Sequence, residues 1–148
     1  MKKKIEKINK LLIQHFGIPS RAKKNPTPLD AIIGTILSQN TNDKNSYQAY
    51  RNLKDNFGNW NELAELTPTK IEKYIKVAGL GKQKSKAIYE LLQSLKMKDN
   101  SVSLDHIKTK NDAEILEELT SYNGVGVKTA SCVLLFSLGR NVCPVDTH

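Results

Sequence analysis

The chain has 148 residues, of which 39% are hydrophobic, a composition typical of one soluble globular domain. No stretch approaches the roughly eighteen continuous apolar residues that a membrane span needs, and the basic start leads into an amphipathic pattern unlike a secretion signal. Lysine and arginine number 23 against 15 acidic residues, a net charge of +8. This charge favours a polyanionic partner, although a solvated basic surface would explain it equally well. We expect a cytoplasmic protein with no membrane partner.

Apolar residues recur at intervals of three and four along most of the chain, which is the periodicity of amphipathic helices. The predicted segments are a helix over 3–16, a basic loop over 21–28, helices over 28–39 and 43–57 around the polar run 38–43, short helices over 59–66 and 71–77, a helix over 83–95, a polar segment over 97–111, and helices over 113–119 and 127–138. Trp60 and the five tyrosines fall at helix-periodic positions and are predicted to belong to the core.

No segment alternates apolar and polar residues over four or more positions, so evidence for strands is nearly absent. About eight short helices with short connections predict an all-α bundle or barrel. We expect a single domain over 1–148, in which 1–24 form an N-terminal helix and basic loop and 25–148 form the core. A helix-hairpin-helix unit is expected at about 113–138.

Two cysteines, Cys132 and Cys143, lie eleven positions apart, which matches no zinc or iron–sulfur spacing. Cys132 stands in an apolar run and is predicted to be a buried, inert thiol. No metal site is predicted from this pair.

The segment from Asn123 to Ser131 contains a Gly-x-Gly turn that opens a helix. Gly124 and Gly126 allow a phosphate to approach the backbone closely, and amides at a helix start carry partial positive charge. Thr129 could donate a further hydrogen bond. By itself this pattern is a weak signal, because many joints between two helices need glycine.

Lys128 lies on the first turn of this helix, and Asp146 follows 18 positions later. A lysine amine can act as a nucleophile towards a sugar carbon once its proton has been removed. A nearby carboxylate can stabilise developing positive charge or move that proton. A phosphate clamp, an amine and a carboxylate together indicate chemistry on nucleic acid.

With these residues at these spacings, the chain resembles the helix-hairpin-helix DNA glycosylases, and most of all the endonuclease III type. Seven positions of that family's hairpin pattern match here, with Tyr122 and Asn123 in place of its Leu-Pro, and the family's Val-Asp-Thr-His is complete at 145–148. The loop 37–43 and the segment 79–87 are also similar to family motifs. The resemblance covers about residues 25–148.

The resemblance implies a bifunctional glycosylase and abasic-site lyase. Lys128 would attack C1′ of a flipped-out nucleotide, release the base and form a Schiff base that permits β-elimination of the 3′ phosphate. Asp146 would stabilise the oxocarbenium-like sugar. The alternatives are that Lys128 only contacts a phosphate and that Asp146 only caps a helix.

Further residues are expected to contact double-stranded DNA that contains a damaged base or an abasic site. They are the hairpin residues Gly124, Val125, Gly126 and Thr129, the wedge candidates Gln39, Asn40, Thr41 and Leu80, and the lysines Lys82 and Lys84. A wedge must fill the gap that a flipped base leaves. Ordinary alternatives are helix-end capping by the amides, a buried contact for Leu80 and a solvated surface for the lysines.

The endonuclease III type usually continues into a segment with four cysteines that bind a [4Fe–4S] cluster. No cofactor is expected in this chain. The [4Fe–4S] cluster is expected only if a longer protein contains such a segment. We expect a monomer that acts on an oxidised pyrimidine, and that is weakly active if it is a fragment. The alternatives are a mismatch glycosylase for thymine or uracil opposite guanine and a non-catalytic helix-hairpin-helix module that binds DNA.

Overall fold

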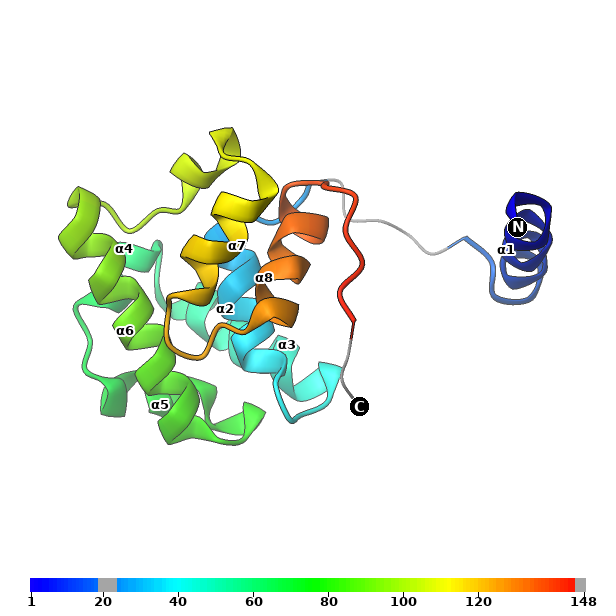
Figure 1. Cartoon of the computed structure of the whole chain (residues 1–148). Coiled ribbons are helices and arrows are strands. Elements are labelled where there is room, and N and C mark those ends of the chain that lie inside the picture. The colour runs from blue at the N-terminus through cyan, green and yellow to red at the C-terminus, as the bar shows by residue number, and fades with distance from the viewer. Residues whose placement is uncertain (19–23, 146–148) are drawn as a thin grey trace.

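The computed structural model describes residues 1–18 and 24–145, and these residues are helical with no strand (Figure 1). The elements are α1 (Lys2–Phe16), α2 (Pro28–Ser38), α3 (Asp43–Asn56), α4 (Trp60–Ala64), α5 (Pro68–Ile75), the 3₁₀ turn η1 (Lys76–Ala78), α6 (Gly81–Asp99), the 3₁₀ turn η2 (Asp105–Thr109), α7 (Asp112–Thr120), α8 (Val127–Cys132) and the π-helical turn η3 (Val133–Ser137). The all-α prediction is confirmed. Within the described ranges, no helix is long and apolar enough to cross a membrane.

Polar caps explain where several helices begin. The side chains of Asn42 and Asn59 accept hydrogen bonds from amides of the first turns of α3 and α4. Asn111 and Glu114 form a reciprocal capping box at the start of α7. Thr27 caps α2, whose first residue, Pro28, has no N–H to satisfy. These caps are local signals, which is why the helix starts are visible in the sequence.

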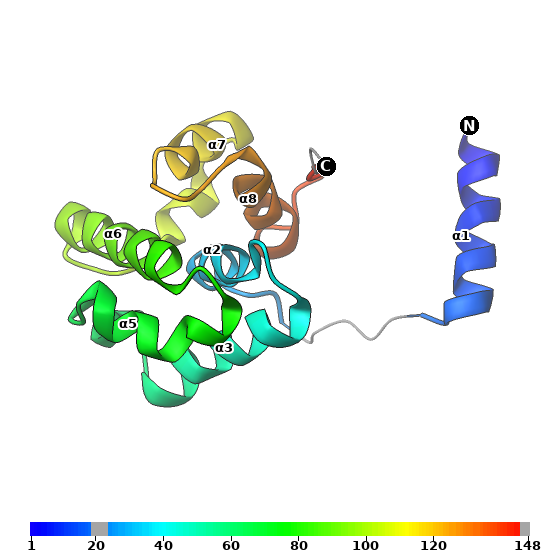
Figure 2. The same cartoon turned by 90° about the horizontal axis from the view of Figure 1, so that it is seen from below.

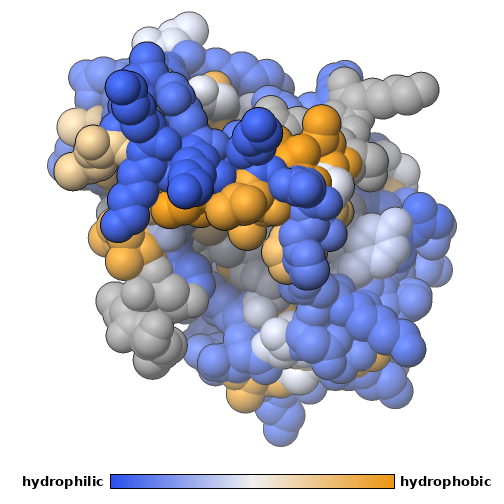
Figure 3. Space-filling view, turned by 90° about the vertical axis from the view of Figure 1, so that its right-hand side faces the viewer, coloured by the Kyte–Doolittle hydropathy of each residue, from blue (hydrophilic) through white to orange (hydrophobic). Residues whose placement is uncertain are grey.

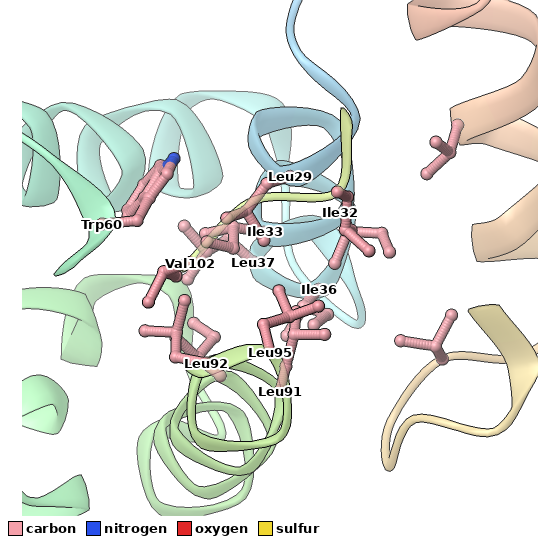
Figure 4. Close-up of a cluster of buried hydrophobic side chains, with 14 of the residues drawn as sticks. Leu29, Ile32, Ile33, Ile36, Leu37, Trp60, Leu91, Leu92, Leu95 and Val102 are labelled. Atoms are coloured by element: carbon pink, nitrogen blue, oxygen red, sulfur yellow. The ribbon is translucent and has the colours of Figure 1, made fainter. Parts of the chain in front are cut away.

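Helix α2 is the centre of the core. Its apolar residues point to more than one side, and each is at most 3% exposed: Leu29, Ile32, Ile33, Ile36 and Leu37. They pack against α3, α6 and α8, and Figure 4 shows Ile36 beside Leu91 and Leu95 of α6. Because α2 is enclosed by its neighbours, it fixes the position of the loop that comes after it.

Asp30 on α2 joins three helices through its carboxylate. Tyr50 Oη on α3 donates to it at 2.9 Å, and Trp60 Nε1 on α4 donates at 3.0 Å. Burial opposes the charged form of Asp30, but these hydrogen bonds, one from Thr27 and the charge of Lys54 lower its pKa overall. Trp60 is buried as predicted, whereas the prediction for the tyrosines is wrong for Tyr47, which is 65% exposed.

Helix α1 lies apart from the other helices in both ribbon views (Figures 1 and 2). None of its residues is buried, and its apolar side chains remain exposed, from 40% for Ile13 to 77% for Phe16. Figure 3 looks at the side of the molecule that α1 occupies and shows hydrophobic residues gathered beside hydrophilic ones. Helix α1 therefore has the predicted amphipathic pattern, but its apolar side chains are not covered by the rest of the described protein.

The last helix differs from its prediction as one α-helix over 127–138. After Cys132 the chain widens into a π-helical turn, in which the N–H of Leu138 donates to Val133 O at 3.2 Å. Gly139, with φ of 66°, then ends the helix, and Arg140 N donates to Leu134 O at 2.9 Å. Single π turns are frequent at functional sites. No residue pattern in the sequence predicts this π-helical turn.

Candidate active site and nucleic-acid interface

The turn between α7 and α8 has the geometry of a tight hairpin. The N–H of Val125 donates to Tyr122 O at 3.2 Å, and Gly124 has a φ of 79°, which lies in the left-handed region. A Cβ at Gly124 would lie 2.9 Å from the Ala87 Cβ, closer than real Cβ contacts allow. Gly124 is therefore required both by the turn and by the close approach of α6.

Gly126 has a different environment. Its φ is −89°, which any residue adopts, and a Cβ there would meet nothing within 4 Å. It is the N-cap of α8, and its carbonyl accepts the N–H of Ala130 at 3.0 Å. The fold does not require glycine at this position, which leaves the space beside the helix start open to a ligand.

Two side-chain hydrogen bonds hold the hairpin in place. One side chain belongs to the turn itself, and the other comes from the loop after α2. Asn123 Nδ2 donates to the carboxylate of Glu90 on α6 at 2.5 Å. Gln39 Nε2 donates to Gly124 O at 3.1 Å, across 85 positions of sequence. The loop after α2, predicted as a DNA-facing segment, thus contacts the glycine turn directly.

A cavity of about 540 Å³ opens between α2 and α8. Its lining residues are Thr35, Ser38, Gln39, Asn40, Lys128, Thr129, Cys132 and Phe136. This volume is in the range of sites that take small molecules, roughly 300–1,000 Å³. The structure therefore brings the predicted nucleophile, one hairpin residue and two wedge candidates together around one hollow.

Lys128 is exposed on the first turn of α8 and lines this cavity. Cys132 and Phe136 come after it at intervals of four, and both also line the cavity. Burial raises the pKa of the Cys132 thiol, while the positive charge of Lys128 acts in the opposite direction. Cys132 is only half-buried, so the prediction of a buried thiol is wrong.

Cys132, Phe136, Thr35 and Ser38 were not predicted as site residues. The i, i+4, i+8 spacing from Lys128 was the signal that could have found the first two, because such residues share one helix face. Thr35 and Ser38 carry no such signal: each hydroxyl donates to a carbonyl of its own helix, and only the packing of α2 beside α8 places them in the cavity wall.

The remaining hairpin residues are more buried than predicted. Thr129 is 6% exposed and reaches the cavity wall. Val125 is 5% exposed, and its N–H is already bonded to Tyr122 O. The prediction that Val125 contacts DNA is therefore corrected for its side chain and its N–H, because the core and the turn occupy them.

Asn40 and Leu80 both have a φ of 49°, in the left-handed region that residues with a Cβ seldom adopt. Asn40 is exposed at the cavity wall, and Leu80 is 49% exposed in the turn before α6. Thr41 is half-buried and does not line the cavity. Lys82 is exposed over a separate hollow between α5 and α6.

Lys84 is placed against its prediction. It is 2% exposed, and its ammonium donates to Leu37 O and to Ala78 O, both at 2.8 Å. Burial lowers the pKa of Lys84. Because its charged end lies inside the protein, Lys84 cannot track a phosphate backbone from this position, and the prediction of a DNA contact is corrected.

Asp146, the predicted carboxylate partner of Lys128, lies outside the described residues. The [4Fe–4S] cluster implied by the resemblance needs four cysteine ligands. The chain has two cysteines, and within residues 1–18 and 24–145 no three His, Cys, Asp or Glu side chains come together as metal ligands would. The residues present therefore do not fit that cluster.

These features define a class: an all-α protein with an anchored helix-hairpin-helix turn and a lysine-lined cavity at its second helix. Comparison with known proteins identifies the family. The model of the HhH-GPD superfamily of base excision DNA repair proteins matches residues 33–148. The chain belongs to this superfamily, which confirms the resemblance seen in the sequence.

Individual relatives agree with this assignment. Endonuclease III of Thermotoga maritima is 32% identical over 144 residues, which cover 97% of this chain and 62% of that protein. Endonuclease III of Sulfolobus acidocaldarius is 33% identical over 125 residues, which cover 79% and 51%. The chain spans about two-fifths to two-thirds of the length of the first curated relatives that it matches.

Solved structures show the same fold. The chain is similar to an endonuclease III trapped as a covalent intermediate with DNA, with a TM-score of 0.74, 20% identity and coverage of 100% of this chain and 65% of that one. It is also similar to a 3-methyladenine DNA glycosylase of Helicobacter pylori, with a TM-score of 0.75, 23% identity and coverage of 97% and 67%. At these identities the likeness concerns the fold alone.

Proposed function

We propose that this chain carries the catalytic core of a bifunctional DNA glycosylase and abasic-site lyase that acts on duplex DNA. The observation that supports this most is the position of Lys128, on the wall of the cavity and on the first turn after the glycine hairpin. A helix-hairpin-helix module that only bound DNA would need no lysine at the wall of such a hollow.

The reaction derives from the chemistry of an amine. A damaged nucleotide that leaves the base stack would enter the cavity, at a cost of a few kcal/mol in unstacking. The neutral amine of Lys128 attacks C1′, the C1′–N bond breaks, and the base leaves with the bonding electron pair and takes up a proton. The nitrogen, positively charged after the attack, then loses one proton, and its lone pair opens the sugar ring while O4′ takes up a proton from water. The resulting protonated Schiff base acidifies the C2′–H and permits β-elimination of the 3′ phosphate.

Other residues would serve this reaction in defined ways. Gly126 would let a phosphate approach the amides at the start of α8, and Lys82 would contact the backbone nearby. Asp146 is proposed to stabilise the positive charge that develops on the sugar. Asn40 and Leu80 are proposed as the wedges that fill the gap in the duplex.

The relatives support a damaged base as the substrate, and an oxidised pyrimidine is our proposal because the curated relatives include endonuclease III proteins from several organisms. The solved neighbours include an 8-oxoguanine glycosylase and 3-methyladenine glycosylases, so the same fold accommodates other bases. A panel of duplexes with one oxidised pyrimidine, one 8-oxoguanine or one guanine–thymine mismatch decides between them.

Borohydride trapping tests the central step. The purified chain is incubated with a duplex that contains one abasic site, and the Schiff base is reduced to a stable adduct. We expect an adduct with the wild-type chain, none with Lys128→Ala, and an undiminished amount with Lys70→Ala, which removes an exposed lysine of α5. Binding of the duplex without any adduct would contradict the lyase assignment and favour a module that only binds DNA.

A further inference from the structure

A buried ammonium group without a carboxylate partner is costly, because the charge loses its hydration and gains only neutral acceptors. Lysine is almost never fully buried unless it is paired. At 2% exposure, Lys84 is the largest fully buried side chain among the described residues, and its two hydrogen-bond acceptors are both backbone carbonyls. The fold therefore keeps a desolvated charge in its interior that is compensated by two backbone carbonyls, and the places of these carbonyls in the fold indicate its role.

The two carbonyls belong to separate helix ends. Leu37 lies in the last turn of α2, and Ala78 is the last residue of η1. Carbonyls in a last helical turn have no partner within their helix, and the negative end of the helix dipole lies there. One ammonium therefore completes two helix ends that are 41 positions apart in the chain.

Each of these helix ends leads directly into a turn that contains a residue in the left-handed conformation. Asn40 stands three positions after Leu37, Leu80 stands two positions after Ala78, and both have a φ of 49°. Within the described residues only one further non-glycine residue, Asn100, has a positive φ. A leucine has no polar group to support the left-handed conformation, so the surrounding structure must hold it.

Both turns face outward on the same side as the hairpin. Asn40 is exposed at the cavity wall, and Leu80 is 49% exposed. The loop after α2 and the turn before α6 lie side by side in both ribbon views (Figures 1 and 2). Gln39 links the first of these turns to Gly124 of the hairpin. Lys84 thus completes a chain of contacts that runs through all three turns.

We propose that Lys84 is a positioning residue, whose ammonium holds the turns of Asn40 and Leu80 at a fixed separation so that both side chains enter the duplex together when a base is extruded. This inference rests on the proposed function, because it assumes that the protein flips bases. Lys84 touches neither the substrate nor the reacting atoms. It acts through the two turns, because its ammonium caps both of the helix ends that lead into them, and it does not contact the duplex.

The test measures base extrusion separately from binding and from chemistry. The full chain is mixed with a duplex that carries a tetrahydrofuran abasic analogue next to 2-aminopurine, whose fluorescence rises when it is unstacked. Lys84→Met removes the ammonium and keeps an unbranched side chain, whereas Lys84→Arg keeps the charge and the donors. Lys96→Met is the matched control, because Lys96 lies at the far end of the same helix and pairs with Glu65 at the surface.

We expect Lys84→Met to slow the fluorescence rise at least about tenfold, since small misplacements of positioned groups cost factors of roughly ten to a hundred. The dissociation constant for undamaged duplex should stay within about threefold, because the phosphate contacts that dominate such binding are untouched. Lys84→Arg should recover part of the lost rate, and Lys96→Met should behave as the wild type does.

A double-mutant cycle with Leu80→Ala separates positioning from general loss of stability. If Lys84 acts through the wedge turns, the two substitutions overlap, and the double variant is slowed by far less than the product of the two single effects. Effects that multiply in full would overturn the inference. Should Lys84→Met fail to fold, the same cycle is run with Lys84→Arg.

Two outcomes distinguish this inference from the function on which it rests. A wild-type signal that Lys84→Met leaves unchanged contradicts the positioning role alone. A wild-type chain that gives neither a fluorescence rise nor a borohydride adduct contradicts the proposed function, and the positioning role with it.

Discussion

The two glycines of the hairpin differ in what surrounds their backbones. Gly124 combines a φ of 79° with a neighbouring Ala87 Cβ that would lie 2.9 Å from an added Cβ. Gly126 has an ordinary φ of −89° and open space. The same residue type therefore serves the fold at one position and leaves room for a ligand at the other.

Alanine at each of these positions should give opposite results. We expect Gly124→Ala to lower the free energy of unfolding by about 1–3 kcal/mol, because it combines a strained φ with a steric clash. Gly126→Ala should change stability by no more than about 0.5 kcal/mol, yet weaken binding to an abasic duplex about tenfold, the loss of roughly one hydrogen bond to a charged group. Urea unfolding and fluorescence anisotropy measure the two quantities. A stable Gly124→Ala protein, or a Gly126→Ala protein with full affinity, would refute the assignment.

Single residues also show where the sequence alone was insufficient. The nucleophile candidate, the glycine turn and the wedge loop were predicted, because each belongs to a contiguous motif. Lys84 stands among Lys82, Gln83, Ser85 and Lys86, a setting typical of a solvated surface. Its true partner carbonyls include one 47 positions away, so only the tertiary structure reveals that it is buried.

Glu118 on α7 makes polar contacts with α6, with η2 and with Lys110. Its carboxylate accepts hydrogen bonds from Lys110 at 2.6 Å and from Lys98 of α6 at 2.9 Å, and it lies 2.7 Å from His106 Nε2 of η2. Partial burial raises the pKa of Glu118, but these contacts outweigh that effect and lower the pKa to about 2. This carboxylate therefore links α7 to α6 and to η2 through polar contacts.

The shift predicts how stability depends on pH. The folded pKa of about 2 lies below the ordinary 4.5, so Glu118 contributes stability that is fully present above pH 4.5 and is lost as the pH falls towards 2. Since Lys98 is half exposed and screened by solvent, we expect a contribution of roughly 1–2 kcal/mol at neutral pH. Denaturant unfolding from pH 7 to pH 2 should show some loss in both the wild type and Glu118→Gln, because Asp30 also has a lowered pKa, but the wild type should show the additional loss that comes from Glu118. Glu117→Gln, an exposed neighbour, should retain it.

Secondary structure was largely predictable because its signals are local. Apolar spacing and polar caps located most of the helices to within a few residues, although α6 extends from Gly81 to Asp99, beyond the predicted 83–95. The π-helical turn after Cys132 was not predictable, since it forms where residues 133–137 contact α2, which is distant in the sequence. The cavity was not predictable either, because two of its walls come from helices that are far apart in the chain.

At the scale of the whole molecule, α1 contributes much charge and little packing. It carries five lysines and one glutamate, which is half of the net charge of +8. None of its residues is buried. The remaining described helices enclose their core around α2 without any contribution from α1.

Removal of residues 1–17 should therefore leave the core intact. We expect the melting temperature to change by no more than about 2 °C, because almost no apolar area leaves the protein interior. Circular dichroism together with the fluorescence of Trp60, the single tryptophan, follows the transition. A control that replaces Ile8 and Leu12 with glutamine retains the charge. A fall in melting temperature of more than about 5 °C would show that α1 docks onto the core in solution.

The cavity is lined by α2 and α8, and the two helices have separate roles. The α8 side holds the lysine, whereas α2 presents Thr35 and Ser38, whose hydroxyls donate to carbonyls of their own helix. Exchanging these two hydroxyl residues would reshape the chamber and leave the amine where it is. This separation makes the protein suited to directed evolution. A small library of substitutions at positions 35 and 38 could change which lesion is accepted and leave the chemical step unchanged.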